Sequence, residues 1–340
     1  MLTPSGRFDA PICVDHLSRR AQELIQRSVW YSLALLLVCT GLPPVLGLSD
    51  LSFLPVLGGI LALATLCSLA EPVEHRRTFW SLFCLALLGR LAVLVAVHWA
   101  ALGAGGPFLG PDSTSYLEGS QDLAARAYRL PLHPALYLGS YDSAHYYLFA
   151  FAIRTFGVDL FALQLLNCGF TALVGPLMFS TSRVIVPRFA VLVGLIVALH
   201  PSLIVLSVLD LLKDPSVLFA TVLTVWGLTR LVSVDGVRGT AGSVLAIFFG
   251  MTYLRMDRFY LAIFIELAVL GAAVAVLLRG RWGSIQLRSV AAGAVALLAA
   301  ELAPAMLGWP PTPVMINSQL DHVGKAEGLF GYSPGLAARG

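Results

Sequence analysis

Apolar stretches about 20 residues long recur along most of the chain, and they constrain its fold more than any other feature. A stretch of that length crosses the roughly 30 Å hydrocarbon layer of a bilayer as an α-helix. No soluble core needs so much apolar surface, because 58% of the residues are hydrophobic and 12% are charged, whereas a soluble domain carries about 25% charged residues. The sequence therefore predicts an all-α integral membrane protein with about nine transmembrane helices, at residues 28–47, 51–70, 79–102, 161–182, 189–208, 215–233, 240–254, 259–278 and 289–308.

The arginines between these spans predict the orientation of the chain in a bacterial inner membrane. Lys and Arg are retained on the cytoplasmic side of short loops. The net charge of +3 is then a topology signal and does not indicate a nucleic-acid partner. A cytoplasmic N-terminus places the following residues inside: Arg7, Arg19, Arg20, Arg27, Arg76, Arg77, Arg183, Arg188, Arg230, Arg238, Arg279, Arg281 and Arg288.

The spans divide the chain into three predicted parts. Residues 1–27 form a cytoplasmic segment with a short basic amphipathic helix on the inner surface, and no cleavable signal peptide precedes the first span. Residues 28–308 form one transmembrane domain, and residues 309–340 form an extracytoplasmic tail. The five cysteines have no CxxC or metal-type spacing, so we infer no disulfide from them.

The longest connection, residues 103–159, lies on the extracytoplasmic side in this topology. Loops of this length are usually functional. The sequence predicts a helix from Pro111 to Arg129, with Asp112 at its start as either a helix cap or a catalytic carboxylate. The aromatic stretch from Tyr141 to Gly157 predicts a second helix that lies on the outer leaflet.

Two further outer segments carry charges within apolar sequence. The first follows His200 and contains Asp210, Lys213 and Asp214. Lys213 either forms a local ion pair with Asp214 or Asp210, or these charges are functional groups near membrane depth. The second is the run from Arg255 to Arg258, whose two guanidinium groups can bind phosphate oxygens bidentately. Binding of lipid headgroups without any chemistry is the alternative for this run.

Arg90, His98, Glu266 and Glu301 are among the ionisable residues inside predicted spans. We expect Arg90 to snorkel or to pair within the helix bundle, and Glu266 and Glu301 to pair between helices. His98 either is a satisfied structural residue or lines a cavity beneath the long outer loop.

The order of these features resembles the GT-C class of integral membrane glycosyltransferases, particularly the bacterial relatives of protein mannosyltransferases and aminoarabinose transferases that use polyprenyl-phosphate sugars. Asp112, Ser113, Tyr116 and the run DLAARAY are similar to the family's first acidic loop. Similar family elements are RTFGVDLFALQLLN, HPSLIVLSVLDLLKDPSVLF and the outer Arg element YLRMDRFYLAIF. The resemblance covers roughly residues 80 to 280.

The resemblance implies a GT-C-like fold and transfer of a sugar from a polyprenyl phosphate to a glycan, glycolipid or protein acceptor of the cell envelope, on the extracytoplasmic face. Asp112 lacks an adjacent second acid, so we name no metal ligands, and Mg²⁺ or Mn²⁺ shared between Asp112 and the phosphate is an alternative. Family members commonly continue beyond a tail such as residues 309–340, so a shortened form is one expectation. The implied residues are Asp112 as general base, Arg255, Arg258 and Lys213 at the donor phosphate, and Tyr116, His200 and Asp214 at the substrate.

Three other functions stay open at this point. The first is a transporter or flippase for a lipid-linked sugar, although we find no repeat and no matching pair of broken helices of the kind that many transporters have. The second is a non-catalytic membrane subunit of an envelope complex. The third is an O-antigen polymerase or ligase, which uses a pyrophosphate-linked oligosaccharide.

Overall fold

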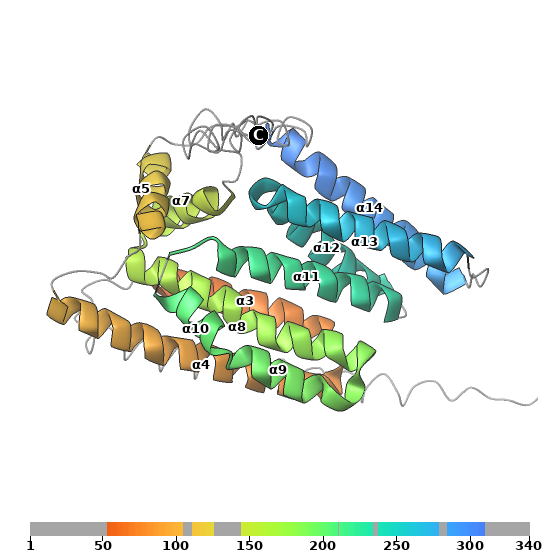
Figure 1. Ribbon diagram of the computed structural model, residues 1–340, viewed down its shortest axis with the longest axis horizontal. Coiled ribbons are helices and arrows are strands. Elements are labelled where there is room, and N and C mark those ends of the chain that lie inside the picture. Colours follow the sequence, from red (N-terminus) through yellow and green to blue (C-terminus); the bar gives the residue numbers. More distant parts are fainter. Residues whose placement is uncertain are drawn as a thin grey trace, which may run out of the picture. The chain divides into compact units, whose positions relative to one another are not determined.

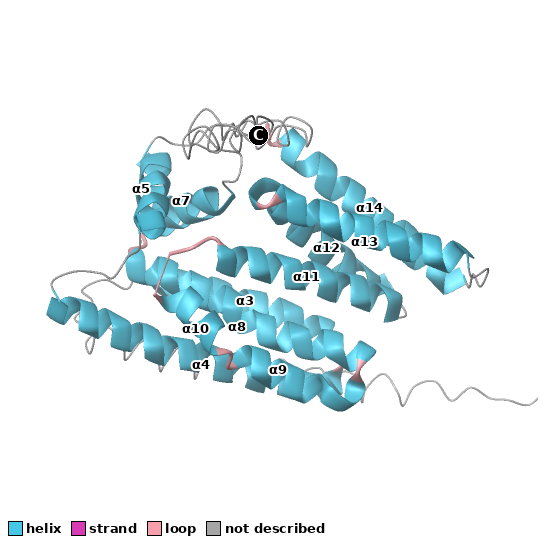
Figure 2. Cartoon of the chain, viewed as in Figure 1, coloured by secondary structure: helices cyan, strands magenta, loops and turns pink. Residues whose placement is uncertain are grey.

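The computed structural model describes residues 53–104, 111–125, 144–209, 211–233, 237–278 and 284–309. Within these ranges every regular element is a helix, as Figure 1 and Figure 2 show. This confirms the predicted all-α class. The helices form two compact units, each built from two separate stretches of the chain. The predicted span at 28–47, the predicted segment 1–27 and all of the predicted tail 309–340 except Trp309 lie outside the described residues, and the division into these parts stays a prediction.

The first unit is organised around one buried helix. Its elements are α3 (Phe53–Ala70), α4 (Val73–Ala104), α8 (Leu160–Ile185), the 3-10 helix η1 (Pro187–Phe189), α9 (Ala190–Ala198) and α10 (Pro201–Val208). The other four α-helices pack against α8. Oδ1 of Asp159 caps the start of α8 by accepting a hydrogen bond from the backbone N–H of Ala162 at 3.0 Å. Helices α8 and α9 approach so closely that a Cβ atom on Gly175 would lie 3.1 Å from the carbonyl oxygen of Gly194.

The predicted span at 189–208 is interrupted in the structure. Helix α9 ends at Ala198 and α10 begins at Pro201. Proline has no N–H with which to continue the hydrogen bonds of a helix, so the ladder stops there. Arg90 of α4 is fully buried and donates to the carbonyl oxygen of Ala198 at 2.8 Å. The predicted pairing of Arg90 within the helix bundle is therefore confirmed, and it acts at the helix break.

The second unit contains the helices of the long outer connection together with the last four helices. Its elements are α5 (Pro111–Ala125), α7 (Ala144–Phe156), α11 (Asp214–Ser233), α12 (Val237–Asp257), α13 (Phe259–Leu278) and α14 (Ser284–Met306). Helix α5 packs on α7, and α12 packs on α11, α13 and α14 (Figure 1). An apolar core that includes Ile247, Met251 and Leu254 of α12 joins the last four helices. Residues predicted as one loop therefore fold with helices that follow much later in the chain.

Helices α5 and α7 agree with the two helices predicted in the 103–159 connection. Helix α5 has Asp112 in its first turn, and its predicted continuation to Arg129 lies outside the described residues. Helix α7 ends where Gly157 adopts φ +63° and donates to the carbonyl oxygen of Ile153 at 2.8 Å. Glycine suits this left-handed position because it lacks a Cβ atom. With 13 residues, α7 is too short to cross a bilayer.

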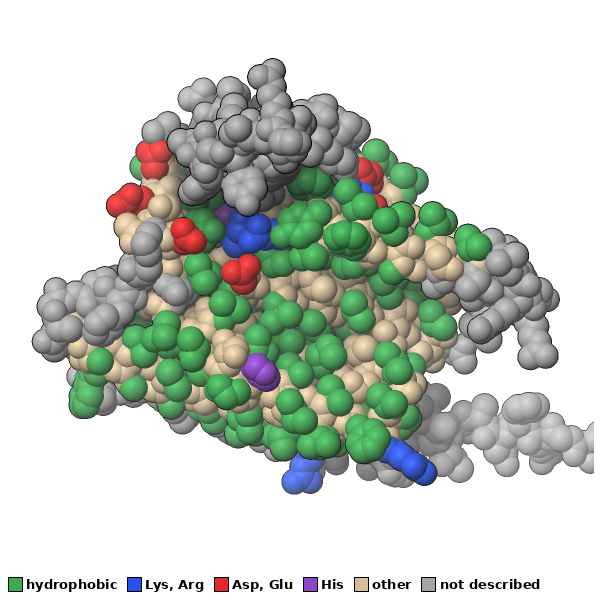
Figure 3. Space-filling view, viewed as in Figure 1, with side chains coloured by type: hydrophobic (Ala, Val, Ile, Leu, Met, Phe, Trp, Pro, Cys, Tyr) green, Lys and Arg blue, Asp and Glu red, His purple; other side chains and the backbone are tan. Residues whose placement is uncertain are grey.

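Six helical segments of the described chain are long and apolar enough to cross a membrane. Helix α12, predicted as the span 240–254, is not among them, and the apolar part of α13, Phe259–Gly271, is shorter than a span. Hydrophobic side chains cover much of the helix surface in Figure 3. The architecture is that of a multi-pass membrane protein, and the predicted count of about nine is not confirmed. The six segments are Phe53–Ala70, Val73–Ala101, Leu160–Ile185, Pro187–Val208, Asp214–Ser233 and Ser289–Met306.

Candidate functional site

A buried pair of His145 and Asp257 joins the start of α7 to the end of α12. Nδ1 of His145 lies 2.7 Å from Oδ1 of Asp257, and neither side chain is exposed. Because an ionised carboxylate only accepts hydrogen bonds, Nδ1 carries a proton. Nε2 of His145 and Oδ2 of Asp257 are also buried, and they have no hydrogen-bond partner among the described residues. The contact therefore fixes the orientation of the imidazole ring.

Asp257 also caps helix α7. The backbone N–H of His145, in the first turn of α7, points at Oδ1 of Asp257 at 3.3 Å. The first N–H groups of a helix have no acceptor within the helix. The partial positive charge at that end also favours a carboxylate. One carboxylate oxygen thus holds both the backbone and the side chain of His145.

Two tyrosine rings surround the imidazole of His145. The ring centroid of Tyr116 lies 4.6 Å from that of His145 in an edge-on arrangement, and the centroid of Tyr146 lies 4.1 Å away. The two tyrosine rings are 5.4 Å apart. Burial, followed by the neighbouring Tyr146 and Asp112, raises the pKa of Tyr116 to about 12. The hydroxyl of Tyr116 therefore stays protonated at neutral pH and can donate a hydrogen bond.

Asp112 is an exposed carboxylate in the first turn of α5. It precedes Tyr116 by one turn of α5. Burial is the largest cause of the raised pKa of both Tyr116 and Tyr146, and the negative charge of Asp112 contributes to each. The charge of Asp112 therefore acts on the same two tyrosines that surround His145.

Hydrogen bonds connect the start of α5 to the segment before α11. The backbone N–H of Leu211 donates to the hydroxyl oxygen of Ser113 at 3.0 Å, in a contact that is buried. Ser216 in the first turn of α11 donates to the carbonyl oxygen of Lys213 at 2.7 Å. These bonds fix the backbone around Lys213 and link its segment to the first turn of α5.

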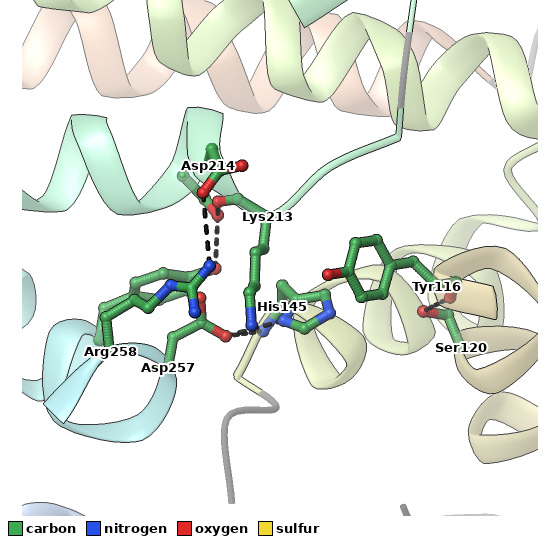
Figure 4. A network of polar contacts seen from close by, with 9 residues as sticks. Tyr116, Ser120, His145, Lys213, Asp214, Asp257 and Arg258 are labelled. Atoms are coloured by element: carbon green, nitrogen blue, oxygen red, sulfur yellow. Dashed lines mark hydrogen bonds and ion pairs between the residues drawn. The ribbon is translucent and has the colours of Figure 1, made fainter. Parts of the chain in front are cut away.

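Lys213 brings a buried cation to the site. Its exposed fraction is 9%, and among the described residues its ammonium group forms no ion pair. Figure 4 shows the side chain directed toward His145 and Asp257. Most of the side chain is buried, and its ammonium nitrogen is not among the fully buried atoms that lack a partner, so an anion can reach it. Lys213 is therefore suited to an anionic ligand.

The two arginines of the predicted outer element are held differently. Arg255 is buried, and its Nη2 lies 2.6 Å from each carboxylate oxygen of Glu266 and also pairs with Glu301. These contacts confirm the predicted pairing of both glutamates between helices. Nη2 of Arg258 lies 3.6 Å from Oδ1 of Asp214, and both side chains are partly exposed. Arg258 therefore has the longer ion pair and the better access to solvent.

Most of the predicted site residues belong to the second unit. Asp214 forms an ion pair with Arg258, whereas one of the alternatives from the sequence was a local ion pair with Lys213. His200 belongs to the first unit, where it is exposed in the turn before Pro201. The ring of His98, also in the first unit, contacts Phe161 edge-on at 5.5 Å, as a structural histidine would. The predicted residues in the second unit are Asp112, Tyr116, Lys213, Asp214, Arg255 and Arg258, and their roles stay predictions.

Sequence reasoning missed the pairing of His145 with Asp257. The sequence predicted His145 only as part of an outer helix, and it showed Asp257 only as the acidic residue between two arginines. Each is an ionisable residue at the end of an apolar helix, which signals that it needs a partner. The two positions are 112 residues apart, however, and no periodicity connects them.

The second unit thus contains an exposed carboxylate, Asp112, and two cationic side chains, the buried Lys213 and the partly exposed Arg258. The carboxylate can accept a proton, and the cations can bind phosphate oxygens. In the part of the chain that the structure describes, no group of three or more His, Cys, Asp or Glu side chains is placed to hold a metal ion. No protein-family model matches the chain, and comparison with curated proteins and solved structures gives no match either. The resemblance to GT-C enzymes therefore rests on the sequence features alone.

Proposed function

We propose that the chain is a membrane glycosyltransferase that moves a sugar from a polyprenyl phosphate to a glycan, glycolipid or protein acceptor of the cell envelope. One observation carries the proposal: the bond between Ser113 and Leu211 holds an exposed carboxylate and a buried lysine on adjoining segments. Transfer from a sugar phosphate needs a proton acceptor and a cation near each other. The apolar helices suit a donor whose hydrocarbon chain lies in the bilayer.

Asp112 is the general base in this mechanism. Its carboxylate takes the proton of the acceptor hydroxyl while that oxygen bonds to the anomeric carbon of the sugar. The bond between the anomeric carbon and the phosphate oxygen breaks at the same time, and its electrons leave with the polyprenyl phosphate. Attack opposite the phosphate inverts the anomeric carbon. The exposure of Asp112 supports this role, because an acceptor can reach it.

Lys213 and Arg258 bind the phosphate that departs. Negative charge grows on the phosphate oxygens as the bond to the sugar breaks, and fixed cations stabilise that charge. Arg255 also faces two carboxylates, Glu266 and Glu301, which compete with a phosphate for its guanidinium group. We therefore assign Arg255 to holding the turn between α12 and α13, from which Arg258 extends.

The proposed site lies on the extracytoplasmic face of a bacterial inner membrane, and the proposed fold is GT-C-like. With the N-terminus in the cytoplasm, the arginine-rich connections such as the one that contains Arg183 and Arg188 lie inside. The connections that contain Asp112, Lys213 and Arg258 then lie outside, where a donor headgroup and an envelope acceptor can meet.

Transfer of a radiolabelled sugar from polyprenyl phosphate, measured with the protein in lipid nanodiscs, tests the role of Asp112. Asp112→Asn should slow transfer by about 10² to 10⁴-fold while donor binding persists, because the amide cannot accept the proton. Glu118→Gln is the matched control, since Glu118 is another exposed acid of α5 and should not matter. Donor binding without any transfer by the wild type would instead favour a transporter.

The same assay tests the phosphate site. Lys213→Met should weaken donor binding and slow transfer by about 10² to 10³-fold. Arg188→Gln removes an exposed cation of the first unit and should leave both unchanged. Normal donor binding by Lys213→Met would place the phosphate elsewhere, and transfer measured with and without EDTA tells whether a divalent cation shares the phosphate.

A further inference from the structure

Asp257 and Lys213 are oppositely charged, buried and directed toward the same region, yet they are not paired. The side chain of Asp257 has no exposed surface, and Lys213 is 9% exposed. Figure 4 shows the side chain of Lys213 pointing toward the His145 and Asp257 pair. In the described part of the chain, the contacts of the Asp257 carboxylate go to His145 and not to Lys213.

His145 engages Oδ1 of the Asp257 carboxylate, and Oδ2 has no hydrogen-bond partner among the described residues. A buried carboxylate must be compensated by hydrogen bonds or by a cation. His145 supplies a side-chain donor at 2.7 Å and a backbone donor at 3.3 Å. Without the imidazole, Asp257 would keep only the longer backbone contact. The ammonium group of Lys213 would then be the natural replacement partner.

The other charged and titratable groups around the pair are already engaged or directed elsewhere. Arg258 is one residue away in sequence and pairs with Asp214. Tyr253 of α12 is in hydrogen-bond contact with Ser216 at 2.6 Å. Tyr116 and Tyr146 present their rings to the imidazole. Lys213 is therefore the cation that an uncompensated Asp257 would attract.

We propose that His145 is a positioning residue: by binding Asp257 it prevents that carboxylate from pairing with Lys213, and so it keeps Lys213 available for the donor phosphate. This inference rests on the proposed function, which makes Lys213 a phosphate ligand. His145 acts through Asp257 and Lys213 and does not itself touch the substrate. The imidazole therefore controls the affinity of the site for phosphate.

A reversal experiment separates this role from a merely structural one. The measurement is equilibrium binding of radiolabelled polyprenyl phosphate to the full chain in nanodiscs, with sugar transfer and thermal unfolding followed in parallel. His145→Leu should weaken binding about tenfold or more, because Asp257 captures Lys213. Adding Asp257→Asn to His145→Leu should restore binding to within about threefold of the wild type, since the competing charge is gone.

Two conservative variants sharpen the test. In His145→Asn, the nitrogen of the introduced side-chain amide replaces Nδ1 as a donor to Asp257, so this variant should bind the lipid phosphate nearly as well as the wild type. His145→Gln places its amide nitrogen farther out, near the position of Nε2, and should bind as weakly as His145→Leu. This contrast also decides the matter if His145→Leu fails to fold. The control is Thr224→Val, which replaces a buried polar side chain of α11 with an apolar one of similar volume and should leave binding unchanged.

The outcomes distinguish this inference from the proposed function. If the double variant binds as weakly as His145→Leu, or if His145→Leu binds like the wild type, the inference is overturned. A wild type that binds polyprenyl phosphate but transfers no sugar would refute the glycosyltransferase, while the binding series still tests His145. A wild type that binds no polyprenyl phosphate would refute both.

Discussion

Replacing Arg90 should destabilise the first unit by on the order of 2 to 5 kcal/mol. Arg90 is fully buried and donates to the hydroxyl of Thr171 at 2.8 Å and to the carbonyl oxygens of Ala86 at 3.0 Å and Ala198 at 2.8 Å. Each hydrogen bond between membrane helices contributes about 0.6 to 1.7 kcal/mol, so three bonds give the stated range. The burial of the charge opposes this stabilisation.

The hydrogen bond from Arg90 to the carbonyl oxygen of Ala198 stabilises the C-terminal end of α9. Helix α9 ends at Ala198, and the last carbonyl groups of a helix have no hydrogen-bond donor within it. Pro201 cannot supply an N–H, and a cation near a helix C-terminus is favourable. Arg90→Met keeps most of the apolar stem but removes all three donors. The loss should therefore loosen the packing of α9 on α4 and α8.

Thermal unfolding of the protein in nanodiscs, followed by circular dichroism, measures this effect. Arg90→Met should lower the unfolding midpoint, and Arg90→Lys should lower it by less because an ammonium group can still reach some of the acceptors. Leu88→Met, at an exposed position of α4, is the control and should be neutral. An Arg90→Met protein as stable as the wild type would refute the reasoning, because the desolvation of the guanidinium group would then cancel its hydrogen bonds.

Three further predictions concern stability. Glu71 is buried and accepts hydrogen bonds from Ser180 and Arg183. Glu71→Gln should therefore lower the free energy of unfolding by about 1 to 3 kcal/mol. An unchanged midpoint of thermal unfolding would contradict this prediction. Gly250→Ala would place a Cβ atom 2.7 Å from the carbonyl oxygen of Ala220, so it should destabilise the folded protein by about 1 to 3 kcal/mol. The control is Gly89→Ala, whose Cβ atom would meet nothing within 4 Å. Equal effects of the two variants on thermal unfolding would refute the packing argument. Burial raises the pKa of Tyr116 from 10.0 to about 12, so the stability that the protonated hydroxyl contributes is fully present below pH 10 and is lost as the pH rises toward 12. Tyr116→Phe should therefore flatten the dependence of the free energy of unfolding on pH between about 10 and 12. An unchanged slope in that range would contradict this prediction.

Much of the helical framework could be predicted from the sequence because its causes are local. Apolar runs predicted α3, α4, α8 and α11 within a few residues of their observed ends, with α4 beginning earlier. Gly157 ends α7 and Asp159 begins α8, and both are familiar boundary residues. The break before Pro201 inside the predicted span 189–208 was missed, because hydropathy alone does not register a proline. Helix α12, predicted as a span, is not among the six candidate spans of the described residues.

The candidate site was predictable only as a set of residues in the right segments. Asp112, Lys213 and Arg258 stand out because charges are costly in apolar sequence. Their partners did not follow from that pattern. Arg255, predicted to bind phosphate, also pairs with Glu266 and Glu301, and Lys213 is a buried lysine whose ammonium forms no ion pair in the described residues.

By itself, the sequence determined that the chain forms apolar helices, where most of them begin and end, and which connections carry ionisable groups. Those properties depend on neighbours within a few turns of the same helix. Only the tertiary structure decided that His145 binds Asp257, 112 residues away, and that Ser113 attaches the segment before α11 to α5. Such pairings depend on which helices pack together, and a buried charge accepts whichever partner that packing brings within reach.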